Sequence, residues 1–336
     1  MSESKFSGNE PIEKKSTEVK IMDRRGSINS SNTIGDGISK PSFNWSQLRK
    51  KSFSKIRLIK GKFLVIVTGA GHGLGRSIAG LAFQDQGIFA QAFSGSKVIM
   101  VDKDMDALNE TSGKKMRQFL KHRKIDVVLE CIDLMNLTET KNFLNDLVAK
   151  NDQDYEHIVF VNNTSTLGNI SQTLMENENL EELEEYWRLN ITSRIYLTTQ
   201  ICKLFPFSKK TVVHTARTES TTASEYMGLS NIATSAFDMF GQTFAKENPT
   251  IRVLYFTPNL LDTKRCRKIV EECPNKDLCE SIQQSIDQGT LETPLDAAKK
   301  MSRILEEYEF TQGEVLRINL KNNNIEIKNN NIENDS

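Results

Sequence analysis

The sequence predicts an α/β fold in which helices cover both faces of one doubly wound parallel sheet. The first observation behind this prediction is the alternation of strand-like and helix-like segments from residue 63 to residue 318. The second is a run of five apolar residues, 63–67, followed by a glycine-rich turn and then by apolar residues at helical spacing over 76–83. A buried strand, a glycine turn and a helix in this order are typical of a Rossmann-type dinucleotide-binding unit.

Each strand is predicted from a short apolar run, and each helix from a longer amphipathic segment. The expected strands are 63–67, 98–101, 126–131, 157–161, 211–214, 251–256 and 314–318, and the expected helices are 76–83, 105–122, 139–150, 180–204 and 224–246. In a parallel, doubly wound sheet, ligands bind at the carboxyl ends of the strands, so the turns after these strands are the expected site.

Glycines stand at alternate positions in the turn after the first strand. Residues without a Cβ let the backbone turn tightly and approach a pyrophosphate, whose charge then lies at the positive end of the following helix. An ordinary tight turn is the alternative, but the preceding strand and following helix favour the dinucleotide interpretation. The predicted phosphate loop comprises Gly69, Ala70, Gly71, His72, Gly73, Leu74 and Gly75.

The 336-residue chain is formally neutral, but its charge is unevenly distributed. Residues 1–62 carry 14 Lys and Arg against 6 Asp and Glu, which leaves 30 basic and 38 acidic residues in the remainder. A mildly acidic body argues against nucleic acid as the main ligand. We expect a disordered basic extension over 1–56, a dinucleotide-binding domain over 57–320 and a disordered Asn-rich tail over 321–336.

Other features of the sequence exclude further classes of protein. No run of about 18 apolar residues is present, so we expect no transmembrane segment, and the polar N-terminus does not resemble a secretory signal. The five cysteines are scattered without a Cys-x-x-Cys motif, and the four histidines show no metal-ligand spacing. We therefore expect reduced thiols, a cytoplasmic location and no metal site.

Residues 44–62 combine basic and large apolar side chains. Trp45, Leu48, Phe53, Ile56 and Ile59 are interleaved with seven Lys and Arg and no acidic residue. This composition fits a basic amphipathic segment that contacts an anionic membrane surface or a partner's groove. It also fits a solvated lead-in to the first strand, which is the commoner role of a run of charges.

The predicted strand ends carry motifs that resemble those of the short-chain dehydrogenases/reductases. Residues 68–75 resemble the cofactor loop of that family, Asp133 and Leu134 its adenine-contacting pair, Asn162 and Asn163 the start of its Asn-Asn-Ala-Gly motif, and Asn190 its helical active-site asparagine. Within the family the chain is most similar to the sepiapterin reductases, over 162–168, 186–193, 210–213 and 258–263. The likeness covers roughly residues 60–320.

This resemblance implies an oxidoreductase that transfers hydride from a nicotinamide cofactor to a carbonyl group. For the sepiapterin reductases the donor is NADPH and the acceptor is a pterin side-chain ketone, on the route to tetrahydrobiopterin. The resemblance also implies further cofactor contacts from Leu261, Asp262 and Thr263. It implies a homodimer formed through the two long helices, 180–204 and 224–246.

The family's catalytic residues are replaced at the matching positions. Ser230 and Thr234 stand where Tyr-x-x-x-Lys is expected, and Arg217 stands where a serine is expected, while Asn190 is retained. None of the six tyrosines is followed four residues later by lysine, so no shift of register restores the motif. An aliphatic hydroxyl is a far weaker acid than a phenol, and a positioned general acid is worth about 10²–10⁴-fold in rate.

Several other residues bear on the ligand. Asp102, at the end of the second strand, is placed to accept from a ribose 2′-hydroxyl and to repel a 2′-phosphate, which favours NAD over NADP. Lys103 could offset this preference, and the alternative role of Asp102 is a helix N-cap. His72 stands where NADP users often have a basic residue, although a histidine is mostly neutral near pH 7.

The expected substrate pocket also departs from the pattern of the sepiapterin reductases. Thr164 and Ser165 replace Ala-Gly beside the nicotinamide end, which we expect to be crowded. Asn259 replaces a glycine at the pterin pocket, and Arg317 falls near the expected pterin-anchoring acid. Arg217 would clamp an anionic ligand group or fill the vacated cleft. The predicted pocket is thus Arg217, Ser230, Asn259 and Arg317, which argues against sepiapterin as a well-held substrate.

The sequence therefore predicts a dinucleotide-binding pseudoenzyme of this family with an unidentified small-molecule ligand. One alternative is an active NAD(P)-dependent oxidoreductase that acts on another carbonyl or alcohol with a different proton donor. A second alternative is a non-catalytic interaction module that no longer binds the cofactor.

Overall fold

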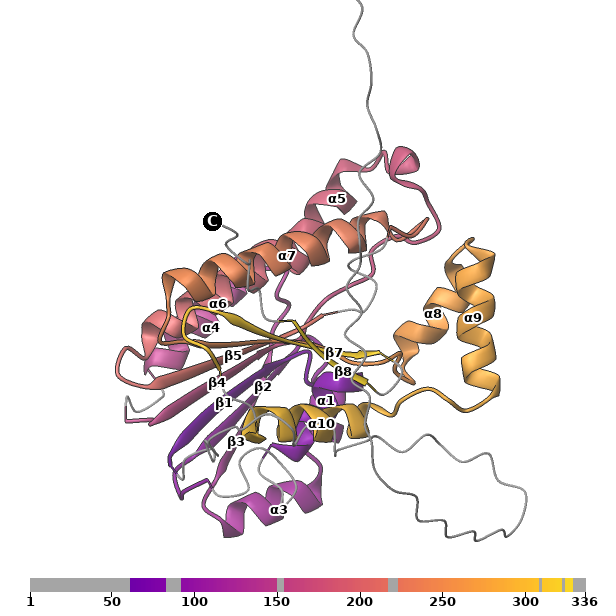
Figure 1. The fold of residues 1–336 in the computed structure, drawn as a ribbon. Helices are drawn as coiled ribbons and strands as arrows, with labels where there is room; N and C mark the ends of the chain where they lie inside the picture. The colour runs from indigo at the N-terminus through magenta and orange to yellow at the C-terminus, as the bar shows by residue number, and fades with distance from the viewer. Residues whose placement is uncertain are drawn as a thin grey trace, which may run out of the picture. The chain divides into compact units, whose positions relative to one another are not determined.

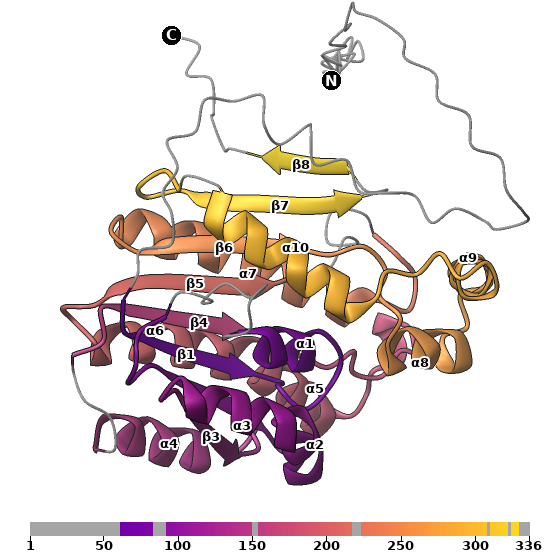
Figure 2. The same ribbon diagram turned by 90° about the horizontal axis from the view of Figure 1, so that it is seen from below.

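The computed structural model describes residues 61–82, 92–149, 154–216, 223–307, 310–321 and 324–328. Its centre is one sheet with the strand order β3-β2-β1-β4-β5-β6-β7-β8 (Figures 1 and 2). Strands β1 to β7 are all parallel, and β8 joins the edge antiparallel to β7. The strands are β1 Phe63–Thr68, β2 Lys97–Asp102, β3 Asp126–Cys131, β4 His157–Asn162, β5 Lys209–Thr215, β6 Arg252–Thr257, β7 Val315–Lys321 and β8 Asn324–Lys328.

Helices cover both faces of this sheet, which confirms the predicted doubly wound α/β fold (Figure 2). One layer comprises α1 Gly73–Leu81, α2 Met105–Thr111, α3 Lys114–His122 and α10 Pro294–Glu307. The other comprises α4 Leu137–Ala149, α5 Leu180–Trp187, a π-helical turn Arg188–Ser193, α6 Arg194–Leu204 and α7 Gly228–Glu247. Two further helices, α8 Lys264–Glu272 and α9 Lys276–Asp287, and a 3-10 turn Leu174–Glu176 complete the described elements.

The strand β1 is buried on both faces, as its unbroken apolar run predicts. All six of its residues are buried. Phe63, Val65 and Val67 pack toward α1 and α10, whereas Leu64 and Ile66 pack toward α4 and α6. The chain reverses its winding between β1 and β4, so the carboxyl ends of these two strands are the switch point where ligands bind in open parallel sheets.

Two predicted long helices are interrupted. The segment 105–122 forms α2 and α3, because Ser112 and Gly113 separate them and glycine is a poor helix former. The segment 180–204 contains the π-helical turn Arg188–Ser193 between α5 and α6. Periodicity does not reveal such a turn, because one inserted residue leaves the apolar pattern almost unchanged.

The sequence analysis missed the helices after β6. The helices α8 and α9 carry many charged residues and bury few apolar positions each, among them Cys266, Ile269 and Ile282. Helix α10 also carries many charges, but it buries Ala297, Ala298, Met301, Ile304 and Leu305 in the core. The prediction of disorder from residue 321 onward was wrong for 324–328, which form β8. In this stretch, apolar and polar residues alternate with the period of a strand, but its Asn-rich composition masks the pattern.

Some sequence predictions fall on residues that the structure does not describe. The predicted disordered extension 1–56 lies outside the described ranges, as does all of the basic segment 44–62 except Gly61 and Lys62. All five cysteines are described and are free thiols. Within the described ranges, no helix has the length and apolar character needed to cross a membrane.

Candidate functional site

Three glycines of the turn between β1 and α1 are required by its geometry. Gly69 and Gly73 have positive φ angles of 67° and 49°, which residues with a Cβ rarely adopt. At Gly75 a Cβ would lie 2.0 Å from the carbonyl oxygen of Gly69, so a side chain there is sterically impossible. Helix α1 begins directly at Gly73, and His72 makes no side-chain capping bond to it. The first-turn amides are thus left for an anionic ligand.

A cleft of about 850 Å³ opens at the carboxyl ends of the central strands. It brings together most of the predicted cofactor residues, namely Gly69, His72, Gly73, Leu74, Asp102, Lys103, Asp133, Leu134, Leu261, Asp262 and Thr263. Ala70 and Gly71 do not line it but hold the turn, since the Ala70 amide donates to the Val101 carbonyl at 3.1 Å and the Gly71 amide donates to Asp102.

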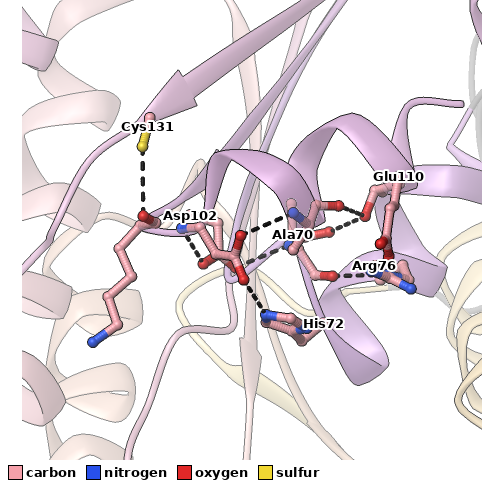
Figure 3. A network of polar contacts seen from close by, with 11 residues as sticks. Ala70, His72, Arg76, Asp102, Glu110 and Cys131 are labelled. Carbon is pink, nitrogen blue, oxygen red and sulfur yellow. Dashed lines mark hydrogen bonds and ion pairs between the residues drawn. The ribbon is translucent and has the colours of Figure 1, made fainter.

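Asp102 fixes the glycine turn against the end of β2 (Figure 3). Its Oδ2 accepts from the Gly71 amide at 2.9 Å, and its Oδ1 accepts from the Asp104 amide at 3.2 Å. The alternative role of Asp102 as a helix cap was wrong, because Asp104 caps α2 by accepting from the Ala107 amide at 2.9 Å. Asp102 is therefore a cleft carboxylate with backbone partners.

Two basic side chains beside the glycine turn have acidic partners (Figure 3). His72 Nε2 lies 3.1 Å from Asp104 Oδ2, and Arg76 Nη2 lies 2.8 Å from Glu110 Oε2. The Ala107 amide, and after it His72, hold the pKa of Asp104 below its usual value. The surroundings of Asp102 therefore carry a second carboxylate, and His72 is engaged by it.

Asn162, which the resemblance to the family predicts as a cofactor contact, ends β4, and Asn163 follows it. Asn162 is completely buried and donates through Nδ2 to the Arg194 carbonyl and to Thr198 Oγ1, so it does not line the cleft. Asn163 lines the cleft instead and donates to the Thr68 carbonyl at 3.1 Å. Successive residues of a strand point to opposite faces of the sheet. A motif that matches two neighbouring asparagines therefore does not tell which of them faces the cleft.

Asn190 lies in the π-helical turn and lines the cleft. Its Oδ1 accepts from the Thr166 amide at 3.0 Å, and its Nδ2 donates to the Tyr186 carbonyl at 3.1 Å. The side chain thus connects the helix to the loop after β4. The distortion of the helix brings Asn190 to the place where the loop needs a partner.

The described residues that the family resemblance matches to catalytic positions line the same cleft. Ser230 and Thr234 both line it from α7, one turn apart, and Ala216 lines it from the end of β5. Thr234 Oγ1 donates to the Ser230 carbonyl at 2.7 Å, so this hydroxyl is engaged within its own helix. Arg217 lies outside the described residues.

Of the remaining predicted pocket residues, Asn259 lines the cleft and Arg317 does not. The Arg317 guanidinium, on β7, forms an ion pair with Asp238 on α7 and lies 5.5 Å from the centre of the Tyr255 ring. Asp238 therefore neutralises the positive charge of Arg317. This partner was not predicted from the sequence.

Comparison with known proteins identifies the family. The short chain dehydrogenase family model matches residues 64–274, which is more than half of the chain. The protein belongs to the short-chain dehydrogenase family. Sepiapterin reductase from Bos taurus is 27% identical over 257 residues, covering 75% of this chain and 93% of the relative. Benzil reductase ((S)-benzoin forming) from Bacillus subtilis is 28% identical over 254 residues, covering 72% and 93%.

Solved structures show the same fold at lower identity. L-sorbose reductase from Gluconobacter frateurii, complexed with NADPH and L-sorbose, has a TM-score of 0.58 at 20% identity, covering 78% of this chain and 96% of that one. The KRED1-Pglu enzyme has a TM-score of 0.62 at 19% identity, covering 76% and 100%. These likenesses confirm the Rossmann-type architecture.

Two arginines of this short-chain dehydrogenase contribute to the cleft although the sequence analysis missed them. Arg194 is buried, its guanidinium lies 3.8 Å from the Phe237 ring centre, and Nη2 donates to the carbonyls of Asn162 and Thr215. Burial lowers the pKa of Arg194 to about 10, so it stays charged at neutral pH. Arg265 on α8 donates to the carbonyl of Ser165 and, at 2.9 Å, to Ser165 Oγ.

Their sequence positions gave only a weak signal. Arg194 directly follows the segment 186–193 that carries the family likeness, and Arg265 follows 258–263. Both are therefore basic residues one or two positions beyond a site motif. Nothing in the sequence distinguishes such residues from surface arginines, because burial comes from packing against Phe237 in one case and from a loop partner in the other.

Two tyrosines of the described ranges, Tyr186 and Tyr255, line the cleft. Tyr186 packs its ring against Gly168, where a Cβ would come within 2.6 Å of it. Tyr255 is buried, and burial raises the pKa of its phenol above the ordinary value. Its hydroxyl has no hydrogen-bond partner among the described residues. A phenol with a raised pKa is a weaker acid, not a stronger one.

Proposed function

We propose that this short-chain dehydrogenase binds a nicotinamide dinucleotide, with NAD favoured over NADP, and turns over carbonyl substrates weakly or not at all. The observation that carries the proposal is the pairing of an intact phosphate cradle with Ser230 and Thr234 at the cleft face of α7. The phosphate cradle needs glycine at positions 69, 73 and 75. Helix α7, in contrast, carries no Tyr-x-x-x-Lys motif.

A bound nicotinamide dinucleotide supplies or accepts hydride, and the protein's own residues must then provide the proton. Thr234 brings no positive charge to Ser230, and its hydroxyl already donates to the Ser230 carbonyl. An alcohol hydroxyl without a base or cation beside it stays protonated near pH 7 and donates poorly. These residues can therefore position a carbonyl group but not protonate it efficiently.

The cofactor preference rests on the ribose end of the cleft. Asp102 presents a carboxylate there, and Asp104, two residues further along the chain, accepts from His72. A 2′-phosphate would meet this negative charge, whereas a 2′-hydroxyl can donate to it. Lys103 also lines the cleft and is the cation that would reduce the preference.

The test uses the purified full-length protein and two readouts. Thermal denaturation with NADH and NADPH reports binding, because a ligand that binds only the folded chain raises the melting temperature. Absorbance of the nicotinamide with sepiapterin or benzil reports turnover, beside an active sepiapterin reductase. We expect stabilisation, greater with NADH, and a rate at least 100-fold below that of the active relative, given the usual contribution of a general acid. A rate near that of the relative would overturn the proposal.

A second candidate function is an active oxidoreductase with a different carbonyl or alcohol substrate. The retained Asn190, held in the cleft by Thr166 and Tyr186, favours it. A screen of small ketones and alcohols, followed by nicotinamide absorbance, distinguishes this function from the first. If neither dinucleotide raised the melting temperature, a non-catalytic interaction module would be favoured, in line with crowding by Thr164, whose Oγ1 is buried without a described partner.

The relatives and the free thiols suggest the substrate class and location. Sepiapterin reductase and benzil reductase are named for ketone substrates of different size, so an organic carbonyl is the ligand class that we propose. The free thiol of Cys131 is exposed, which suits a reducing compartment such as the cytoplasm.

A further inference from the structure

The outward face of α3 carries a concentration of basic side chains. Between Gly113 and Ile125 the chain has no acidic residue, and the exposed side chains there include Lys114, Lys115, Arg117, Lys121 and Lys124. Met116 and Leu120 on the opposite side of the helix pack against the core of the α1/α10 layer. Figure 1 shows α3 at the outer side of this layer, on the side of the sheet away from α7. The helix is therefore amphipathic, with one cationic face in water.

This distribution differs from that of an ordinary solvated face. The chain after residue 62 has more acidic than basic residues, yet one short helix gathers positive charge alone. A surface that served only solubility would carry positively and negatively charged side chains interspersed with one another. The nearest exposed carboxylate before the helix, Glu110, is already paired with Arg76. The face therefore presents a local positive field on a negative body.

Two exposed aromatic rings accompany the cations. Phe119 on α3 is 37% exposed, and Phe93, in the turn before β2, is 49% exposed. Arg123 connects them, because its guanidinium lies 5.9 Å from the Phe119 ring centre and donates to the carbonyl of Ala92 at 3.4 Å. Large apolar rings beside lysines and arginines are typical of surfaces that rest in the headgroup region of a membrane.

The basic segment of the sequence enters the domain at the same place. The Phe93 amide donates to the Gly61 carbonyl at 2.8 Å, and the Gly95 amide donates to the Lys124 carbonyl at 2.8 Å. Gly61 directly follows residues 44–60, where Trp45 and other large apolar residues alternate with lysines and arginines. The end of α3 and the end of this segment are thus neighbours. The composition of the segment, with tryptophan, basic residues and no acid, favours a lipid surface over a nucleic acid.

We propose that the α3 face, defined as Lys114, Lys115, Arg117, Phe119, Lys121 and Lys124 together with Phe93, docks this protein on an anionic lipid bilayer. The lysines and arginines face the anionic headgroups, and the two phenylalanine rings enter the interface. The function of the cleft is independent of this contact, because α3 contributes no residue to the cleft lining. The docking holds the dinucleotide-binding domain at the membrane surface.

Vesicle co-sedimentation with the full-length chain tests the proposal. Vesicles of phosphatidylcholine alone are compared with vesicles containing 30% phosphatidylserine, at about 0.1 M and about 0.5 M salt. We expect partitioning to the anionic vesicles only, and its loss at high salt because screening shortens the range of the field. Each lysine near an anionic surface contributes about fivefold to partitioning. The triple variant Lys114→Gln, Lys115→Gln, Lys121→Gln should therefore bind at least tenfold more weakly.

The matched control removes the same charge elsewhere. Lys203, Lys246 and Lys276 are exposed residues of α6, α7 and α9, and their triple Gln variant should keep partitioning within threefold of the wild type. A second variant, Phe119→Ser, should weaken binding to vesicles but leave binding to heparin, a soluble polyanion, unchanged. Equal binding of the two triple variants would overturn the proposal, as would sedimentation that ignores phosphatidylserine. Binding to heparin or RNA without binding to vesicles would also overturn it.

Discussion

At the scale of single residues, the cleft combines retained and replaced functional groups on adjacent elements. Asp102 and the glycines of the β1–α1 turn keep their backbone contacts, and Asn190 keeps its place in the π-helical turn. On α7, Ser230 and Thr234 line the cleft at the positions that the family resemblance matches to an acid and a cation. The two ends of the cleft can therefore be tested by separate substitutions.

Asp102→Asn tests the ribose end. The amide keeps an oxygen that can accept from a backbone amide, but it removes the negative charge that would repel a 2′-phosphate. We expect the ratio of the NADPH to the NADH dissociation constant to fall about tenfold, which corresponds to about 1.4 kcal/mol. Titration calorimetry measures both constants. Asp133→Asn, at another carboxylate lining the cleft, serves as the control, and an unchanged ratio in Asp102→Asn would contradict the assignment.

His214 predicts a dependence of stability on pH. It is buried among Phe237, Phe240 and Tyr255, and burial, followed by the charge of Arg194, holds its pKa well below 6.5. As the pH falls below about 6.5, the unfolded chain binds a proton that the folded chain refuses. The free energy of unfolding should therefore be highest above pH 6.5 and fall by about 1 kcal/mol per pH unit below it.

Urea denaturation at pH 7.5 and pH 5.5 measures this loss. His157 is half-buried against Phe63, and its pKa is also lowered by desolvation, so it adds to the loss in the wild type. His214→Leu should show a smaller loss between the two pH values than the wild type. His122→Gln, at an exposed histidine, should not. Equal losses of unfolding free energy in the wild type and in His214→Leu would show that His214 does not cause the pH dependence.

At the scale of elements, α8 contacts the loop after β4. Arg265 at its first turn donates to the carbonyl and hydroxyl of Ser165, and both residues line the cleft. The helix itself packs on the loop through Cys266 and Ile269, which share a cluster with Leu167 and Ile170. The contact thus joins two segments that line the cleft.

Arg265→Ala removes the hydrogen bonds that hold this contact. Because a hydrogen bond to a charged group contributes about 1.5–3 kcal/mol, the loop and α8 should separate more readily. We expect both the association and the dissociation rate of NADH to rise severalfold, measured by stopped-flow fluorescence. The control is Lys268→Ala, on the same helix but paired with Glu272 and outside the cleft lining. An unchanged dissociation rate in Arg265→Ala would show that the contact does not restrict the ligand.

The sequence predicted strands better than helices for a physical reason. Buried parallel strands such as β1 are unbroken apolar runs, so their positions are visible without the structure. Helices α8 and α9 bury narrow apolar stripes among many charges, and the interruption at Gly113 leaves the periodicity nearly intact. In the site, glycine positions were predictable because sterics demand them, but Arg317 was not, since its partner Asp238 lies 79 residues away.

At the scale of the whole molecule, the topology of the sheet fixes the position of the cleft. The strand order reverses at β1 and β4, so a cleft forms there whatever the catalytic residues are. One surface of α7 remains outside this arrangement. Up to residue 245 its exposed residues are Ile232, Ser235, Ala236, Met239 and Thr243, which recur at helical spacing and include no charge; the exposed Lys246 and Glu247 follow at the end of the helix. Ile232 and Met239 are 48% and 59% exposed.

An uncharged helical stripe of this kind predicts self-association through α7, in agreement with the homodimer that the family resemblance implies. A second copy would bury the stripe against its own equivalent, because two-fold interfaces bring the same surface together from both subunits. Light scattering after size exclusion should therefore give twice the chain mass of 38.1 kDa.

Met239→Glu places a charge at the centre of the stripe and should shift the protein to the monomer mass. Phe207→Glu alters a 96% exposed ring before β5, and this control should leave the dimer intact. If the wild type eluted at the monomer mass at all concentrations tested, the α7 stripe would not be a dimer interface. If both variants dissociated the dimer, the interface would lie elsewhere.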